Sequence, residues 1–192
     1  MYILKVEERN FANLMIYKIR NIFLLSVLLL NTANVSYADG HQKDIQAVFL
    51  YNLVNYIFWP NDKNNNVHNI CLVNDPSMEN YLLQIQKKAK ERGSIINVYN
   101  VNDVPDEYLK NKICHILFFS ENAAKTSLSR LAGLHAKNVL TVSAAKNFSR
   151  NGSVEFAFLD GRLKLILNTK KLKESGLSAS SKLLRLAKVV SN

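Results

Sequence analysis

Residues 69–101 read NICLVNDPSMENYLLQIQKKAKERGSIINVYNV, and they contain the clearest indication of the fold class. The short apolar run at 69–73 is bounded by polar residues, which is typical of a buried strand. The segment NDPS at 74–77 offers a turn and a helix N-cap, and an amphipathic helical pattern follows over 78–92. The alternating run at 95–101 predicts a second strand. A strand, a helix and a strand in this order predict parallel strands joined by a crossover helix.

The alternation of strands and helices continues toward the C-terminus. Residues 113–119 (ICHILFF) predict a central strand, 121–135 a helix and 139–142 (VLTV) another strand. Farther on, the alternating runs 154–159 and 162–167 flank Asp160-Gly161, a dipeptide typical of a tight hairpin turn. We therefore predict an α/β fold: a single three-layer domain with a mixed, mostly parallel sheet that ends in a C-terminal antiparallel hairpin and is flanked by helices.

Further helices are predicted at both ends of this domain. Residues 45–58 (IQAVFLYNLVNYIF) are apolar on nearly all faces, which is typical of a helix that is buried on several sides or meets a partner. Trp59-Pro60 ends this helix, because the residue before proline avoids the α region. Near the C-terminus, 169–175 and 180–190 are predicted to be helical.

The N-terminal segment predicts export. Lys18 and Arg20 precede a short apolar run at 21–30 (NIFLLSVLLL), and Ser36-Tyr37-Ala38 supplies a small-x-small cleavage signal. We predict a signal peptide over 1–38, cleaved after Ala38, and a mature domain over 39–192, with no membrane span after cleavage. The alternative is a membrane anchor, although a spanning helix needs about 20 apolar residues. Translation starts at Met1 or at Met15.

Composition and charge narrow the class of protein. The chain has 192 residues, 48% of them hydrophobic, with few glycines and prolines, so it is neither disordered nor fibrous. Its formal charge of +10 invites a nucleic-acid-binding interpretation. The basic residues are scattered, however, and an exported protein rarely meets DNA, so we predict no nucleic-acid partner.

The sequence contains no recognisable catalytic or cofactor motif. It lacks G-x-G-x-x-G, Walker, G-x-S-x-G and H-E-x-x-H patterns. His41, His68, His115 and His135 are not spaced as a metal-binding pair on a helix. His115 follows Cys114 in a predicted strand, where neighbours point to opposite faces, so His115 is interpreted as a structural residue. We predict no catalytic residues, no metal and no cofactor.

Cys71 and Cys114 each fall in an apolar strand of the same predicted sheet. Export to an oxidising compartment permits a disulfide between them, and the alternative is two buried thiols. Closing this loop of about 44 residues would stabilise the fold by roughly 4 kcal/mol in the chain-entropy model.

Six motifs together resemble the YfiR/HmsC-like family of periplasmic proteins. The opening helix matches an A-x-x-L/F-Y-N…W-P pattern from Ala47 to Pro60, and a Cys-His strand begins at Cys114. The other similar segments are 71–76, 139–143, 161–168 and 175–187. The resemblance covers nearly all of residues 42–190, in order.

The resemblance implies a regulator without enzymatic activity. Such proteins bind the periplasmic sensor part of an inner-membrane diguanylate cyclase and repress it, which lowers cyclic di-GMP and restrains biofilm formation. They form homodimers, and their cysteine pair that corresponds to Cys71 and Cys114 can form a disulfide. Some members carry a second pair near the hairpin, but this chain has no cysteine after Cys114.

Two sets of residues are candidates for partner binding, and each has a plainer alternative. The aromatic set lies at the end of the apolar first helix, and its alternative is a role in the core. The basic set is expected on one face of the last helix, and its alternative is a solvated surface. The members are Tyr51, Tyr56, Phe58 and Trp59 in the aromatic set and Lys182, Arg185 and Lys188 in the basic set.

A competing interpretation is an exported small-ligand-binding or sensor input domain. Ligands of open α/β sheets bind at the carboxyl ends of the strands. In this chain such a site would lie near Asn74, Asp75 and Ser143. An exported hydrolase is a weaker alternative, because its motifs are missing. Asp103, Asp106 and Glu107 could bind a cation but lack the spacing of a calcium loop.

Overall fold

The computed structural model describes residues 17, 18, 20, 34–60, 67–91, 93–102, 114–126 and 138–191. The chain divides into two compact units, Met1–Gln42 and Lys43–Asn192. In the first unit, the Arg20 guanidinium lies 5.2 Å from the centre of the Tyr17 ring. The fold described below belongs to the second unit.

The described helices and strands follow one another in the order that the sequence suggests, with some additions. The helices with both ends described are α2 (Asn34–Tyr56), α3 (Pro76–Glu91), α6 (Thr169–Glu174) and α7 (Ser181–Leu186), with a 3-10 turn at Phe148–Arg150. The longer strands are β2 (Val67–Val73), β3 (Ile95–Val101), β4 (Ile116–Phe119), β5 (Leu140–Ser143), β6 (Val154–Leu159) and β7 (Arg162–Asn168). The short strands are β1 (Ile57–Phe58), β8 (Ser178–Ala179) and β9 (Lys188–Val190).

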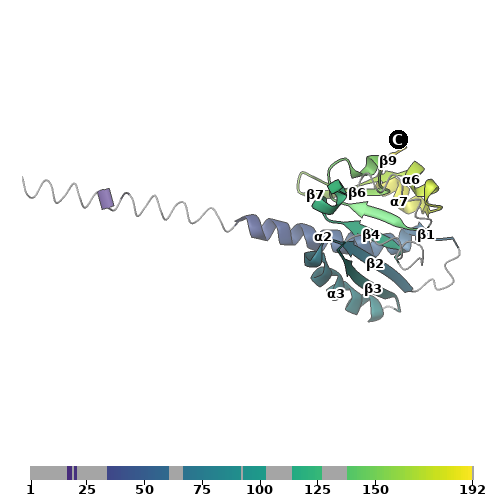
Figure 1. Cartoon of the computed structure of the whole chain (residues 1–192), viewed down its shortest axis with the longest axis horizontal. Coiled ribbons are helices and arrows are strands. Elements are labelled where there is room, and N and C mark those ends of the chain that lie inside the picture. The colour runs from purple at the N-terminus through teal and green to yellow at the C-terminus, as the bar shows by residue number, and fades with distance from the viewer. Residues whose placement is uncertain are drawn as a thin grey trace, which may run out of the picture. The chain divides into compact units, whose positions relative to one another are not determined.

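Seven of the described strands form one mixed sheet in the order β3-β2-β4-β5-β6-β7-β9. All neighbours are parallel except β6 and β7, which pair antiparallel with Phe156 opposite Leu165. Figure 1 shows α3 beside β3 and β2, and α6 and α7 near β9. The predicted α/β class, the mostly parallel sheet, the C-terminal hairpin and the flanking helices are therefore confirmed.

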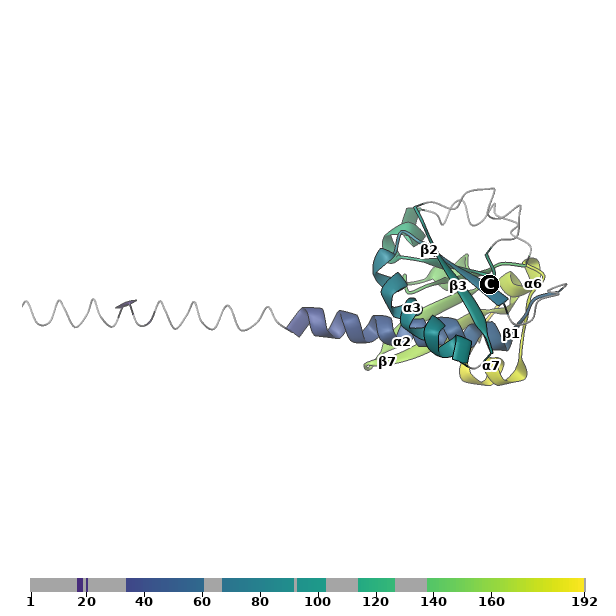
Figure 2. The ribbon, with the colours of Figure 1, turned by 90° about the horizontal axis from the view of Figure 1, so that it is seen from below.

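The two faces of the sheet bury separate clusters of apolar side chains, because successive residues of a strand point to opposite faces. Ile70 and Leu72 of β2 belong to the larger cluster, which also contains the buried face of α2. Cys71 and Val73 belong to the smaller cluster. Leu82 of α3 joins the larger cluster, so α2 and α3 cover the same face of the sheet (Figure 2).

The hairpin turn has the conformation that its sequence predicts. Asp160 and Gly161 have φ angles of 51° and 70°, and a two-residue turn with both φ angles positive matches the right-handed twist of the strands it joins. Glycine adopts positive φ without strain, and aspartate tolerates it better than most residues.

The first predicted helix is wrong at its C-terminal end. Helix α2 ends at Tyr56, and Ile57 and Phe58 form strand β1. Ile57 lies opposite Ala179 and Phe58 opposite Ser178, so pairing with β8 replaces the last turn of the expected helix. The predicted cleavage point after Ala38 lies within α2, and the signal peptide stays a prediction.

The last predicted helix, 180–190, is also wrong. Helix α7 ends at Leu186, and Lys188–Val190 form β9, which extends the sheet parallel to β7. Val189 and Val190 are β-branched, and such residues favour strands. Lys188 therefore lies on a strand, so the basic stripe on one helix does not exist as predicted.

Two smaller differences concern the middle of the chain. Strand β4 begins at Ile116, so Cys114 and His115 precede the strand that was expected to contain them. Residues 121–126 are helical, as predicted. The remainder of that helix, and the acidic residues Asp103, Asp106 and Glu107, lie outside the described residues.

Candidate functional site

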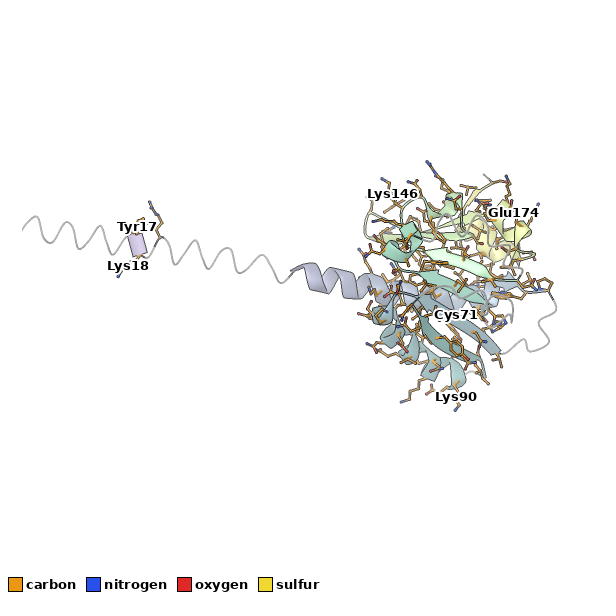
Figure 3. All side chains as sticks on the ribbon, viewed as in Figure 1. Tyr17, Lys18, Cys71, Lys90, Lys146 and Glu174 are labelled. Carbon is orange, nitrogen blue, oxygen red and sulfur yellow. A yellow bond between two sulfur atoms is a disulfide. The ribbon has the colours of Figure 1, made fainter. Side chains whose placement is uncertain are left out.

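Cys71 and Cys114 are joined by a disulfide, and their Cα atoms are 5.8 Å apart. Cys71 lies in the middle of β2 and Cys114 two residues before β4, its neighbour in the sheet. Both are buried within the smaller apolar cluster. Figure 3 shows Cys71 in the middle of the second unit and Lys90 at its edge. The bond ties the edge pair β3-β2 to the centre of the sheet.

The aromatic set does not form one uniform surface. Tyr51, Tyr56 and Trp59 are half-buried and pack against the larger apolar cluster. Phe58 differs, because 62% of its surface is exposed. The structure thus gives the two tyrosines and Trp59 a packing role and leaves Phe58 as the exposed aromatic side chain of the set.

The basic set is exposed but divided between two elements. Lys182 and Arg185 lie on α7, three residues apart, so they are neighbours on one helix face. Lys188 follows on β9. Around them, 38% of the Leu184 side chain and 66% of Leu186 are exposed. This segment therefore presents cations among exposed apolar side chains.

The structure brings the two predicted sets together. The Lys182 ammonium lies 5.2 Å from the centre of the Tyr56 ring. The Ser180 N–H donates a hydrogen bond to the Tyr56 carbonyl at 2.8 Å, and Phe58 lies opposite Ser178 in the two-stranded sheet. We call the exposed side chains of Phe58, Lys182 and Arg185 the β1–α7 surface.

A cluster of Trp59, His68 and His115 was not expected from the sequence. The ring centres lie 5.2–5.8 Å apart. His115 Nδ1 accepts a hydrogen bond from the Asn69 N–H at 3.0 Å, so its ring hydrogen is on Nε2. The buried Nε1 of Trp59 has no hydrogen-bond partner among the described residues. The cluster fixes the chain as it leaves β1, directly beside the β1–α7 surface.

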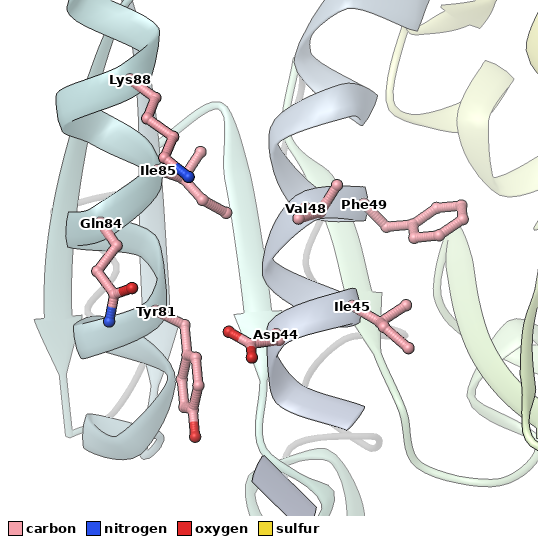
Figure 4. A pocket seen from close by; sticks show the side chains of 8 residues that line it. All are labelled: Asp44, Ile45, Val48, Phe49, Tyr81, Gln84, Ile85 and Lys88. Carbon is pink, nitrogen blue, oxygen red and sulfur yellow. The ribbon is translucent and has the colours of Figure 1, made fainter. Parts of the chain in front are cut away.

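A pocket of about 420 Å³ lies between α2 and α3 (Figure 4). Asp44 and Val48 of α2 face Tyr81 and Ile85 of α3, and Lys88 lies at the far end. The sequence does not predict this pocket, because Val48 belongs to a segment that is apolar on nearly all helical faces. In the structure Val48 lines the pocket and is 47% exposed.

A salt bridge fixes the two helices at one end of the pocket. Lys43 Nζ of α2 lies 3.4 Å from Asp75 Oδ1. The same carboxylate accepts hydrogen bonds from the Met78 N–H at 3.1 Å and from the Ser77 hydroxyl at 2.6 Å, which caps the start of α3. Asp75 therefore has a structural role at the place where sequence analysis considered a ligand site.

Ser143, the third residue considered for that ligand site, is fully buried. Its hydroxyl donates to the Phe119 carbonyl and accepts from the Ala145 N–H, both at 3.0 Å. These bonds join β4 to the turn after β5. Because this hydroxyl is buried and already makes both hydrogen bonds, it is not available to a ligand.

Comparison with protein families matches residues 43–188 to the YfiR/HmsC-like family. The chain belongs to this family. The match covers most of the chain, and it begins where the second compact unit begins. No curated protein matches the chain in sequence. The resemblance inferred from the six motifs is thus confirmed, and family membership indicates a periplasmic regulator rather than an enzyme.

Two further findings describe this YfiR/HmsC-like chain. No helix in the described part is long and apolar enough to cross a membrane. Among the described side chains, no group of three or more His, Cys, Asp or Glu residues could hold a metal ion. Among the described residues, the β1–α7 surface and the pocket between α2 and α3 are two candidate places for interaction.

Proposed function

We propose that this protein is an exported, non-enzymatic repressor of an inner-membrane diguanylate cyclase. Its signal peptide is removed after Ala38, and the mature chain, 39–192, binds the periplasmic part of the cyclase. Binding holds the cyclase inactive, lowers cyclic di-GMP and restrains biofilm formation. The observation that carries this proposal is membership of the YfiR/HmsC-like family over residues 43–188.

The disulfide supports the periplasmic location. Disulfides persist in oxidising compartments such as the bacterial periplasm and are rare in the cytosol. Cys71 and Cys114 are the two cysteines of the chain, and both are used in this bond. A buried bridge between β2 and the residues just before β4 suits a protein that functions after export.

The β1–α7 surface supports binding to a protein partner. Phe58 offers an exposed aromatic ring, and aromatic residues are enriched in the cores of protein interfaces. Lys182 and Arg185 add positive charge beside it, and the chain contains no acidic residue after Glu174. Electrostatic complementarity then favours an acidic face on the partner and speeds its association.

The test is to measure cyclic di-GMP in cells with and without this gene. Deletion is expected to raise cyclic di-GMP, and the full-length gene is expected to restore the original level. The matched control is a version from which residues 21–30 are deleted, because this deletion blocks export. This version is expected not to restore the original cyclic di-GMP level. No change on deletion, or rescue by the control, would contradict periplasmic repression.

We also propose that the exported protein is a homodimer. Sedimentation equilibrium on protein recovered from the periplasm measures this directly, because the mass of a dimer is twice that of the processed chain. A monomer mass at micromolar concentration would contradict the proposal without affecting the repressor function.

A further inference from the structure

The pocket between α2 and α3 has the form of a groove between two helices. Its α2 wall contains Asp44 and Val48, one turn apart, and its α3 wall contains Tyr81, Ile85 and Lys88. Asp44 and Val48 are four residues apart, Tyr81 and Ile85 four, and Ile85 and Lys88 three. Each wall is therefore one face of a helix. The rise from Tyr81 to Lys88 is about 10.5 Å, or two helical turns.

The floor of the groove is apolar and partly open to solvent. Val48 has 47% of its surface exposed, and Tyr81 and Ile85 are half-buried against the larger apolar cluster. Figure 4 shows Ile85 extending from α3 toward α2, and Val48 of α2 also lines the groove. An apolar side chain placed between them would be covered on both sides.

The two ends of the groove carry opposite charges. Asp44 lies level with Tyr81 at one end, and Lys88 lies at the other end (Figure 4). Neither forms an ion pair with another described residue, whereas the neighbouring Lys43 is held by Asp75.

We propose that this groove receives an amphipathic helix from the periplasmic part of the cyclase. The helix presents apolar residues at i, i+3 or i+4, and i+7, flanked by a basic residue that meets Asp44 and an acidic residue that meets Lys88. The two charged residues are about two turns apart, as Tyr81 and Lys88 are. This inference rests on the proposed function, and it adds a second contact to the β1–α7 surface.

A helix suits this groove better than an extended peptide does. An extended segment needs partners for its backbone N–H and C=O groups, as the edge of a sheet provides. Helices α2 and α3 satisfy their backbone groups internally along the groove. A bound helix brings its own backbone bonds, and its side chains can pack between the ridges of the two walls.

The test compares substitutions at two positions of similar solvent exposure. Val48→Glu places a charge in the groove, and Leu83→Glu places one on α3, where Leu83 is 43% exposed and lies outside the groove. Each full-length variant is expressed with its signal and purified from the periplasm, and its unfolding is checked by circular dichroism. Calorimetric titration then measures binding to the periplasmic segment of each membrane-anchored diguanylate cyclase of the same cell.

Val48→Glu is expected to weaken the affinity about tenfold or more, as a central interface residue does. Leu83→Glu is expected to change it less than about twofold, as a substitution outside the interface does. Lys88→Glu is expected to weaken binding, and replacing the acidic residue of the cyclase helix by Lys is expected to restore it. Restoration by this reciprocal change identifies the helix that lies in the groove.

Four other outcomes would contradict the groove proposal, and each has a different meaning. If the wild-type protein binds a cyclase segment and Val48→Glu binds equally well, the groove proposal is wrong and the proposed function stands. If the wild-type protein binds no segment, both are wrong. If Val48→Glu abolishes only self-association, the groove belongs to a second copy of this chain. If it abolishes only the stabilisation by a small molecule found in a thermal-shift screen, the groove is a ligand site.

Discussion

His115 and Asn69 are joined by two hydrogen bonds that run in opposite directions. The Asn69 N–H donates to His115 Nδ1 at 3.0 Å, and the His115 N–H donates to the Asn69 carbonyl at 2.8 Å. The imidazole thus accepts from the backbone of β2 at a point where β4 has not yet begun. The chain bends at His115, and the side chain continues the hydrogen bonding of the sheet across that bend.

Replacing His115 by Leu is expected to lower the free energy of unfolding by about 1–3 kcal/mol, because the partly buried Asn69 N–H loses this acceptor. His115→Asn should lower the free energy of unfolding by less, since the amide oxygen of Asn can accept the hydrogen bond in place of Nδ1. Urea unfolding of both variants measures the difference. Equal losses would show that ring packing against Trp59, and not the hydrogen bond, carries the effect.

Removing the disulfide is expected to lower the free energy of unfolding by about 4 kcal/mol, because the reduced chain regains the entropy of an open loop. Urea unfolding with and without a reducing agent measures this change. The variant with Cys71→Ala and Cys114→Ala should have the reduced stability under both conditions. Equal stability of the oxidised and reduced wild type would refute the expectation.

Phe58 and Trp59 are adjacent, but their substitutions are expected to have different effects. Phe58→Thr should change the free energy of unfolding by no more than about 0.5 kcal/mol, because the ring is exposed. It should nevertheless weaken cyclase binding about tenfold.

Trp59→Ala should lower the free energy of unfolding by about 2–3 kcal/mol, less than for a fully buried tryptophan, because Trp59 is half-buried against the core. Thermal unfolding and calorimetric binding distinguish the two roles. If Phe58→Thr lowers the free energy of unfolding as much as Trp59→Ala does, Phe58 has a packing role and the expected difference between the two residues is wrong.

Charge reversal on α7 is expected to slow association with an acidic partner. The double variant Lys182→Glu/Arg185→Glu should bind the cyclase segment about tenfold more weakly at low salt, and this difference should shrink as ionic strength rises. The matched control is Arg162→Glu/Lys164→Glu, two exposed cations of the hairpin. An equal loss in both double variants would mean that net charge, and not this surface, controls binding.

Much of the fold could be predicted because local signals and tertiary structure agree there. The segment 95–101 is β3 as predicted, since alternating residues suit a strand that is partly exposed. The Asp160-Gly161 turn fixed the register of the hairpin, and the crossover order fixed the parallel strands. In these places the backbone preference and the apolar pattern favour the same structure.

The errors occur where pairing between distant segments overrides the local pattern. The apolar residues of 180–190 follow helical spacing, yet Lys188–Val190 pair with β7 because the sheet has a free edge there. Ile57 and Phe58 were expected to continue a helix, but β8 pairs with them. Both errors come from partners far away in the sequence.

The candidate site was predicted only in part for the same reason. Residues of the β1–α7 surface were chosen from composition and helical spacing, but their proximity depends on the pairing of β1 with β8. The groove could not be predicted, because it arises from the separation of α2 and α3 rather than from any residue pattern. Its only sequence signal is an apolar position, Val48, which gives no indication of exposure.

The pairing of β1 with β8 has a consequence for the order in which the protein is made. Strand β1 directly follows α2, whereas β8 is synthesised only after β2 to β7. The domain therefore cannot complete its tertiary structure until β8 has emerged from the ribosome. For the export proposed above this delay is useful, because a chain that has not yet folded can pass through a narrow translocation channel.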